Sequence, residues 1–220
     1  GNAAGMYMWL ANGITTIPRI GGQVTVGQSL GAMDKDAAID YVRASLRMGT
    51  LLGIIYGIIC VLFAGPLIGF FKLNSPEVIN DAEIYLVITC GAIVFSFLNQ
   101  VFTGILTAMG NTMAAFRATT IGLIINLVLD PVLIFGFGPI PRMGVTGAAL
   151  ATVFAQIIVF ALYIATVWSE PVIFQHIHLT QRAEKQHVRD IVRIGFPPAV
   201  QDALFSGISM VIARLIAGWG

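Results

Sequence analysis

Apolar runs long enough to cross a membrane are the feature that most constrains this chain. An α-helix needs about 20 mostly apolar residues to span the hydrocarbon core of a bilayer. Five complete or nearly complete runs are present, and a sixth begins near Ile194. Their length predicts helices, because the strands of a membrane barrel would alternate apolar and polar residues over only about 10 positions. The five runs cover roughly residues 7–30, 48–71, 84–109, 118–137 and 144–168, and the first is the most polar.

The amino-acid composition points to the same class of protein. Hydrophobic residues make up 57% of the chain and charged residues 10%, whereas a soluble globular domain carries about 25% charged residues. The chain therefore has too few charges to cover a surface that faces water. It opens with Gly1 and ends at Gly220 inside an apolar run. We expect it to be part of a longer membrane protein.

The distribution of lysine and arginine predicts the orientation, because these residues are enriched on the cytoplasmic side of membrane proteins. If the first run ends in the cytoplasm, the outer side holds only Lys72 and Arg142. Arg19 and Arg214 lie inside apolar runs. All the other basic residues then face the cytoplasm: Lys35, Arg43, Arg47, Arg117, Arg182, Lys185, Arg189 and Arg193.

One long polar segment, residues 169–193, divides the chain into a part before it, 1–168, and a part after it, 194–220. Its apolar residues Val188, Ile191 and Val192 have helical spacing, which predicts a short amphipathic helix at the cytoplasmic surface. We interpret the segment as a solvated linker rather than a metal site, because no cysteine or carboxylate completes a ligand set. It holds all three histidines: His176, His178 and His187.

The sequence "INLVLDPVLIFGFGP" at 125–139 places a carboxylate, Asp130, in an otherwise apolar run. Asp130 lies 13 residues after Arg117, and therefore roughly 20 Å into the membrane at about 1.5 Å per helical residue. A charged aspartate near the bilayer centre costs about 2.5–3.5 kcal/mol even on lenient scales. We therefore expect its side chain to face a cavity or a partner.

The neighbours of Asp130 favour a polar site there. Pro131 has no N–H, so the carbonyl of Leu127 loses its helical partner and the helix is expected to bend. Asn126 is four residues before Asp130 and therefore on the same face. Together they predict a site for a proton or a sodium ion. The alternative is a proline kink whose aspartate is satisfied by a neighbouring helix.

Three other polar residues are candidates for a membrane-embedded cavity. Arg19 lies far from either end of its run, and it could pair with Asp130 or another acid, or extend its long side chain to the surface. Asp202, early in the last run, is either a cavity residue or a hydrated residue near the helix end. Gln156, like Asn99 and Gln100, is uncharged, and such residues more often join membrane helices than bind a substrate.

Three segments resemble the MATE (multidrug and toxic compound extrusion) transporters. "NLVLDPVLIFGFGPIPRMGVTGAALATVFAQ" at 126–156 resembles the family's fifth-to-sixth helix region. "GQSLGAMDKDAA" at 27–38 is similar to the end of its second helix, and "RIGFPPAV" at 193–200 to the start of its seventh. The resemblance implies an all-α integral membrane bundle of two six-helix lobes. This chain would hold helices 2 to 7 of twelve: most of the N-terminal lobe, the cytoplasmic linker and the first helix of the C-terminal lobe.

The resemblance also implies roles for single residues. Asn126 and Asp130 match a polar pair that couples ion movement, and Thr152 matches a sixth-helix residue beside it. The first-helix aspartate of this branch lies outside the chain. Arg19 is not part of the family pattern. The glutamate expected deep in the seventh helix is missing, because Phe205 occupies about that position and Asp202 lies one turn earlier.

We therefore predict an antiporter, coupled to protons or sodium, that exports amphipathic organic cations or drugs. The alternative is a lipid-linked sugar flippase of the same superfamily. An intramembrane enzyme is a remote alternative, because the histidines lie in the polar linker and neither HExxH nor GxSxG occurs. We expect a multi-pass protein of the cell membrane that needs no cofactor and no metal. Its expected partners are lipids, small-molecule drugs and the remaining helices of the full-length chain, with no nucleic acid.

Overall fold

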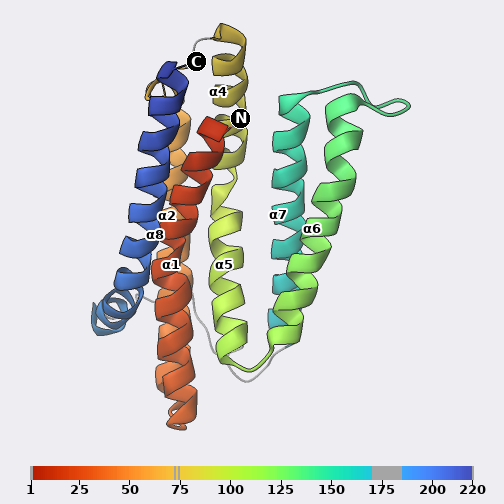
Figure 1. The fold of residues 1–220 in the computed structure, drawn as a ribbon. Helices are drawn as coiled ribbons and strands as arrows, with labels where there is room; N and C mark the ends of the chain where they lie inside the picture. Colours follow the sequence, from red (N-terminus) through yellow and green to blue (C-terminus); the bar gives the residue numbers. More distant parts are fainter. Residues whose placement is uncertain (1, 72, 74, 170–184, 220) are drawn as a thin grey trace.

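The computed structural model describes residues 2–71, 73, 75–169 and 185–219, and these residues form a bundle of long helices (Figure 1). The all-α membrane fold expected from the apolar runs is confirmed. The helices are α1 (Asn2–Gly31), α2 (Lys35–Leu62), α3 (Ala64–Gly69), α4 (Pro76–Gly91), α5 (Ile93–Ala108), α6 (Thr112–Phe135), α7 (Val145–Trp168) and α8 (Lys185–Trp219).

Two short polar connections turn the chain at one end of the bundle. Asp34 accepts a hydrogen bond from the backbone N–H of Ala37 at 3.1 Å and so caps the start of α2. Asn111 caps α6 in the same way, through the N–H of Ala114 at 3.3 Å. Both are typical N-cap residues, whose side chains satisfy a free helical N–H. Both turns lie at the same end of the molecule (Figure 1), as the predicted membrane crossings require.

Two of the predicted runs are interrupted. The second run begins at Lys35 rather than near residue 48, and α2 ends at Leu62 before the short α3. The third run is divided at Ala92, where α4 and α5 bend by 54°. The backbone of Ala92 has φ −117° and ψ 19°, outside the helical region. No proline lies near Ala92 to mark this bend. The apolar run alone therefore predicts a single straight helix.

α1 differs from the other membrane helices. By length and apolarity, α2, α6, α7 and α8 can each cross a membrane, and the bent pair α4–α5 brings the number to five; α1 does not meet this criterion. α1 can be more polar than the other helices because it packs against three of them, α2, α5 and α8. Its buried hydroxyls bond to their own helix: Thr15 to Ala11 and Thr25 to Gly21, at 2.8 and 2.7 Å. A helix enclosed by protein needs no apolar surface for lipid.

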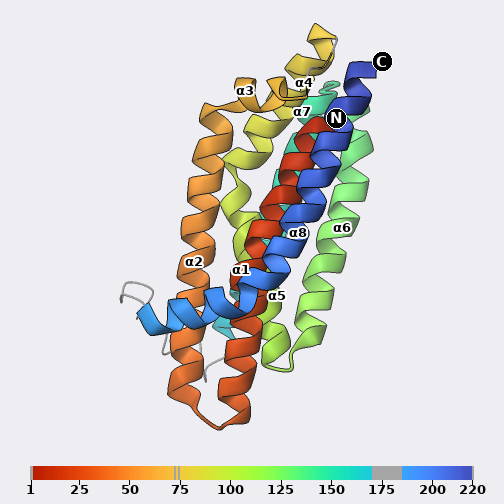
Figure 2. The same ribbon diagram turned by 60° about the vertical axis from the view of Figure 1, so that its left-hand side comes forward.

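α8 is a single helix that joins the end of the polar segment to the last apolar run. It contains Pro197 and Pro198, and its first turns lie at an angle to the rest (Figure 2). The predicted amphipathic helix is therefore the start of α8 rather than a separate element. Residues 170–184, with His176 and His178, lie outside the described residues. The division into two lobes and a linker stays a prediction.

Large apolar side chains remain exposed along the outer faces of several helices. On α6, Leu123, Leu127 and Val128 are each more than half exposed, and on α8 so are Leu215 and Ile216. A soluble monomer rarely exposes apolar patches of this extent. Such faces are satisfied by lipid or by further helices of a membrane protein.

Candidate functional site

Close packing of α6 on α7 sets the relative levels of the predicted site residues along the two helices. A Cβ atom added at Gly122 would lie 2.4 Å from Val159 Cγ2, and one at Gly147 would lie 2.4 Å from the carbonyl oxygen of Leu133. These contacts make the helices antiparallel and place Thr152 of α7 level with residues 128–129 of α6. Thr152 therefore lies within one turn of Asp130. Its hydroxyl donates to the carbonyl of Ala148 at 3.2 Å, within its own helix.

Asp130 is half-buried in the last turns of α6. Within the described residues, no hydrogen bond or ion pair of its carboxylate is found. Pro131 follows it, yet α6 continues as one helix to Phe135. The carbonyl of Leu127 therefore lacks its usual donor one turn below Asp130, as the sequence predicts. The carboxylate without a partner in the described chain and this carbonyl without its usual helical donor are thus one turn apart.

Asn126, one turn before Asp130, supplies a third such acceptor. Its Oδ1 atom is buried and has no hydrogen-bond partner among the described residues. Buried polar atoms are nearly always paired, so an unpaired one calls for an explanation such as a bound ion, a water or a ligand. Positions i and i+4 share a helix face, which places both side chains on the same side of α6.

A polar cavity of about 260 Å³ opens beside Asn126, between α5, α6 and α7. The amide groups of Gln156 and Asn99 line it, as do hydroxyl groups that the sequence analysis did not single out. Asp130 is not one of the lining residues. The cavity is lined by Asn99, Gln100, Thr103, Thr119, Gly122, Leu123, Asn126, Ala155, Gln156, Val159 and Tyr163.

Hydrogen bonds across this cavity join α5 to α7. Asn99 Nδ2 donates to the backbone oxygen of Gln156 at 2.9 Å and to its Oε1 at 2.8 Å. The hydroxyls of Thr103 and Tyr163 are 2.6 Å apart. Gln156 thus has both roles considered from the sequence, since it joins helices and lines a cavity. Asn99 Oδ1 is buried and unpaired among the described residues, like Asn126 Oδ1, and both amide oxygens can accept a donor or coordinate a cation.

Arg19 does not pair with Asp130 in the described part of the chain. It packs on α5 instead, where a Cβ atom at Gly104 would lie 2.5 Å from the Arg19 carbonyl oxygen and 3.3 Å from its Cγ. The pairing considered from the sequence is thus not formed. Only the absence of a side chain at Gly104 allows α1 and α5 to approach this closely.

Asp202 lies on a different pair of helices, at the crossing of α1 and α8. Its Oδ2 accepts a hydrogen bond from Thr16 Oγ1 at 3.0 Å. A cavity of about 290 Å³ lies beside it, walled by the rings of Trp9 and Phe205, which stack with centroids 6.1 Å apart. The structure therefore does not bring Asp202 into the predicted site on α6; it makes Asp202 a bridge between α1 and α8.

Comparisons with known proteins identify the family to which the chain belongs. The MatE family model matches residues 3–132. The chain is 28% identical over 213 residues to a probable multidrug resistance protein, NorM, of Thermotoga maritima, covering 96% of this chain and 45% of that protein. It is 30% identical over 144 residues to an FAD transporter of Shewanella oneidensis, covering 64% and 31%. The chain thus spans less than half the length of these curated relatives.

Two solved structures share the fold. One is an inward-facing MATE family transporter, with a TM-score of 0.83 and 23% identity, covering 94% of this chain and 47% of that one. The other is an outward-facing MATE family transporter, with a TM-score of 0.80 and 23% identity, covering 91% and 44%. At this identity the likeness shows the arrangement of the helices. It does not distinguish the two conformations.

Proposed function

This chain belongs to the MatE family, and from that premise we propose that the full-length protein exports amphipathic organic cations in exchange for an inward-moving cation. Asp130, Asn126 and Thr152 are the proposed coupling residues. The observation that carries the proposal is the buried amide oxygen of Asn126, one turn from the carboxylate of Asp130, both without a partner among the described residues. These oxygens attract a proton or a sodium ion, because either one offsets the cost of a carboxylate at membrane depth.

The coupling follows from this change in charge. With the cation bound, the site on α6 is close to neutral; without it, the site is negative and attracts a positively charged substrate. A cation that binds one conformation more tightly than the other shifts the protein toward that conformation. Export is then driven by the gradient of the cation. The amide-lined cavity beside Asn126 is the proposed place where the two ligands influence each other.

The surroundings of the protein are part of the same proposal. We place it in the cell membrane, where lipids and the remaining helices of the full-length chain cover its exposed apolar faces. The relatives include one named for multidrug resistance and one named as an FAD transporter, and these names support transport of an organic molecule. A flippase for lipid-linked sugars stays the alternative, because Arg19 adds a positive charge at membrane depth.

The test uses full-length protein in proteoliposomes loaded with a fluorescent organic cation. An imposed proton or sodium gradient is expected to accelerate its movement at least several-fold, and only one of the two ions is expected to do so. Liposomes without protein and liposomes without a gradient are the controls. If neither ion has an effect and a lipid-linked sugar crosses the bilayer instead, the flippase alternative replaces the exporter.

A further inference from the structure

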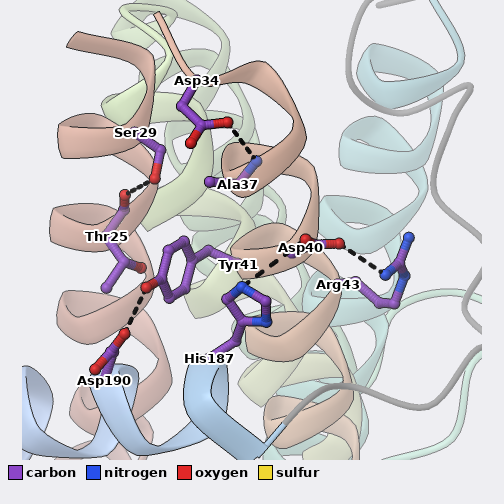
Figure 3. A network of polar contacts seen from close by, with 9 residues as sticks. All are labelled: Thr25, Ser29, Asp34, Ala37, Asp40, Tyr41, Arg43, His187 and Asp190. Carbon is purple, nitrogen blue, oxygen red and sulfur yellow. Dashed lines mark hydrogen bonds and ion pairs between the residues drawn. The ribbon is translucent and has the colours of Figure 1, made fainter. Parts of the chain in front are cut away.

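Polar side chains join the first turns of α8 to the start of α2 (Figure 3). Tyr41 donates its hydroxyl hydrogen to Asp190 Oδ2 at 2.6 Å. His187 Nε2 lies 3.8 Å from Asp40 Oδ2. The rings of Tyr41 and His187 meet edge to face, with centroids 4.8 Å apart. These four residues, Asp40, Tyr41, His187 and Asp190, are named the latch.

Each carboxylate of the latch is also held from its own helix. Arg43 Nη1 lies 3.1 Å from Asp40 Oδ1, and Arg193 Nη2 lies 3.6 Å from Asp190 Oδ1. The side chains of His187 and Asp190 are only 13% and 21% exposed. Exposed ion pairs contribute little because water screens them. The hydrogen bond from Tyr41 to Asp190 is expected to be stronger than such a pair, because hydrogen bonds to charged groups gain strength as water is excluded.

Beyond the latch, α8 is fixed to α1 through backbone contact. A Cβ atom at Gly21 would lie 2.2 Å from the carbonyl oxygen of Ile191. A Cβ atom at Gly195 would lie 2.2 Å from the carbonyl oxygen of Ile17. Ile191 itself is fully buried. The first turns of α8 are therefore held on two sides, by polar side chains of α2 and by the backbone of α1.

A weak point in α8 follows directly after these contacts. Pro197 and Pro198 cannot donate backbone hydrogen bonds, so the carbonyls of Arg193 and Ile194 lose their helical partners. Helices bend at such places, and Figure 2 shows the first turns of α8 at an angle to the rest. The part of α8 beyond the prolines can therefore change direction without unfolding the part before them.

We propose that the latch is a reversible lock between the start of α8 and the start of α2, and that it opens when the transporter changes conformation. This inference rests on the proposed function, because it assumes two alternating conformations. The arrangement suits a lock. The latch consists of a few contacts that can break together, it lies at the predicted cytoplasmic end, and α8 leads from it into the predicted second lobe. The bend at the prolines allows α8 to move once the latch is open.

The first test closes the latch covalently in the full-length transporter. Tyr41→Cys and Asp190→Cys are introduced with all native cysteines replaced, including the buried Cys60 and Cys90, and the pair is joined by a short bismaleimide. Gradient-driven export is expected to fall at least tenfold on linking, while binding of the organic cation persists. The matched control links Met113→Cys to Arg117→Cys, two exposed positions one turn apart within α6 and away from the latch, and is expected to leave export within about twofold.

The second test loosens the latch and does not depend on transport. Ser29→Cys places a thiol at a position only 8% exposed, in a cleft that Tyr41 and Asp190 also line. Tyr41→Phe removes the hydroxyl and keeps the ring, and is expected to raise the rate of labelling by a membrane-impermeant maleimide about tenfold, since a hydrogen bond to a charged group is lost. Tyr85→Phe, on α4 and away from the latch, is the control and is expected to leave the rate unchanged.

The possible outcomes distinguish a failure of the latch proposal from a failure of the proposed export function. Export at the unlinked rate after linking Tyr41→Cys to Asp190→Cys would overturn the latch and leave the exporter intact. Equal labelling rates of Ser29→Cys with and without Tyr41→Phe would overturn it as well. Faster labelling in a protein that moves no organic cation would support the latch and count against the exporter.

Discussion

Asp130 on α6 and Asp202 on α8 are both carboxylates on helices that are long and apolar enough to cross a membrane, but their surroundings differ. The carboxylate of Asp202 accepts a hydrogen bond from Thr16, whose side chain is almost fully buried on α1. The carboxylate of Asp130 has no such partner in the described part of the chain, and the nearest polar group on its helix face, Asn126, is itself unpaired. A carboxylate that joins two helices is occupied, whereas one without a partner remains available to a ligand. The position of a carboxylate on an apolar helix therefore does not by itself identify a coupling residue.

The largest expected effect comes from Asp130→Asn. The amide cannot exchange a proton or neutralise a sodium ion, so gradient-driven export is expected to fall at least tenfold, to near background. Folding and membrane insertion are expected to persist, because no partner charge in the described chain is left unpaired. The measurement is efflux from proteoliposomes under an imposed gradient. Asp202→Asn is the matched control, since asparagine still accepts from Thr16, and export is expected to stay within about threefold.

Equal export by wild type and Asp130→Asn would make Asp130 a structural residue at a proline. Loss of export in Asp202→Asn alone would reverse the comparison and move the coupling site to the crossing of α1 and α8.

The next largest effect is expected on the stability of the fold. It tests how tightly α8, which carries Asp202, packs against α1. Gly195→Ala would place a Cβ atom 2.2 Å from the backbone oxygen of Ile17. α8 must then move away from α1, and the free energy of unfolding is expected to fall by about 1–3 kcal/mol, as for other overpacked sites. Thermal unfolding in detergent measures the change. Gly207→Ala, on the same helix, adds a Cβ atom with nothing within 4 Å, and an unfolding midpoint that falls equally there would show that close contact is not the cause.

A smaller loss is expected from Thr16→Val, which keeps the shape of the side chain but removes the donor to Asp202. Hydrogen bonds between membrane helices contribute about 0.6 kcal/mol on average, so the unfolding midpoint is expected to fall by only a few degrees. Thr15→Val is the control, because in the described residues the hydroxyl of Thr15 bonds only within α1. If both variants lose the same stability, the bridge to Asp202 contributes nothing of its own.

The smallest effect is expected from Arg19→Ala. Arg19 forms no ion pair with Asp130 in the described part of the chain, so its removal is expected to leave the pH dependence of export unchanged. Transport rates measured over a range of pH values, with Asp130→Asn as the reference for a lost response, check this. An optimum that moves by a full pH unit would show that the two side chains interact during transport.

The sequence predicts those features that depend on neighbours along the chain. The apolar runs indicate the helices, and the spacing of Asn126 and Asp130 places them on one face. Contacts between distant residues are not predictable in this way. Thr16 and Asp202 are 186 residues apart, and Thr103 and Tyr163 are 60 apart, so their pairing depends on how the helices pack. The bend at Ala92 is missed for a related reason, since neither Pro nor a polar residue marks it.

The packing of α8 has a consequence for building chimeric transporters. By sequence, α8 is predicted to open the second half of the protein; by packing, it is a neighbour of α1 in the first. Gly21 and Gly195 leave no room for a side chain at this crossing without a shift of the opposing helix. A chimera joined before Lys185 would press a foreign helix against α1, whereas one joined after Trp219 would inherit the two helices as a matched pair. The junction that suits exchange therefore lies one helix later than the boundary that the chain suggests.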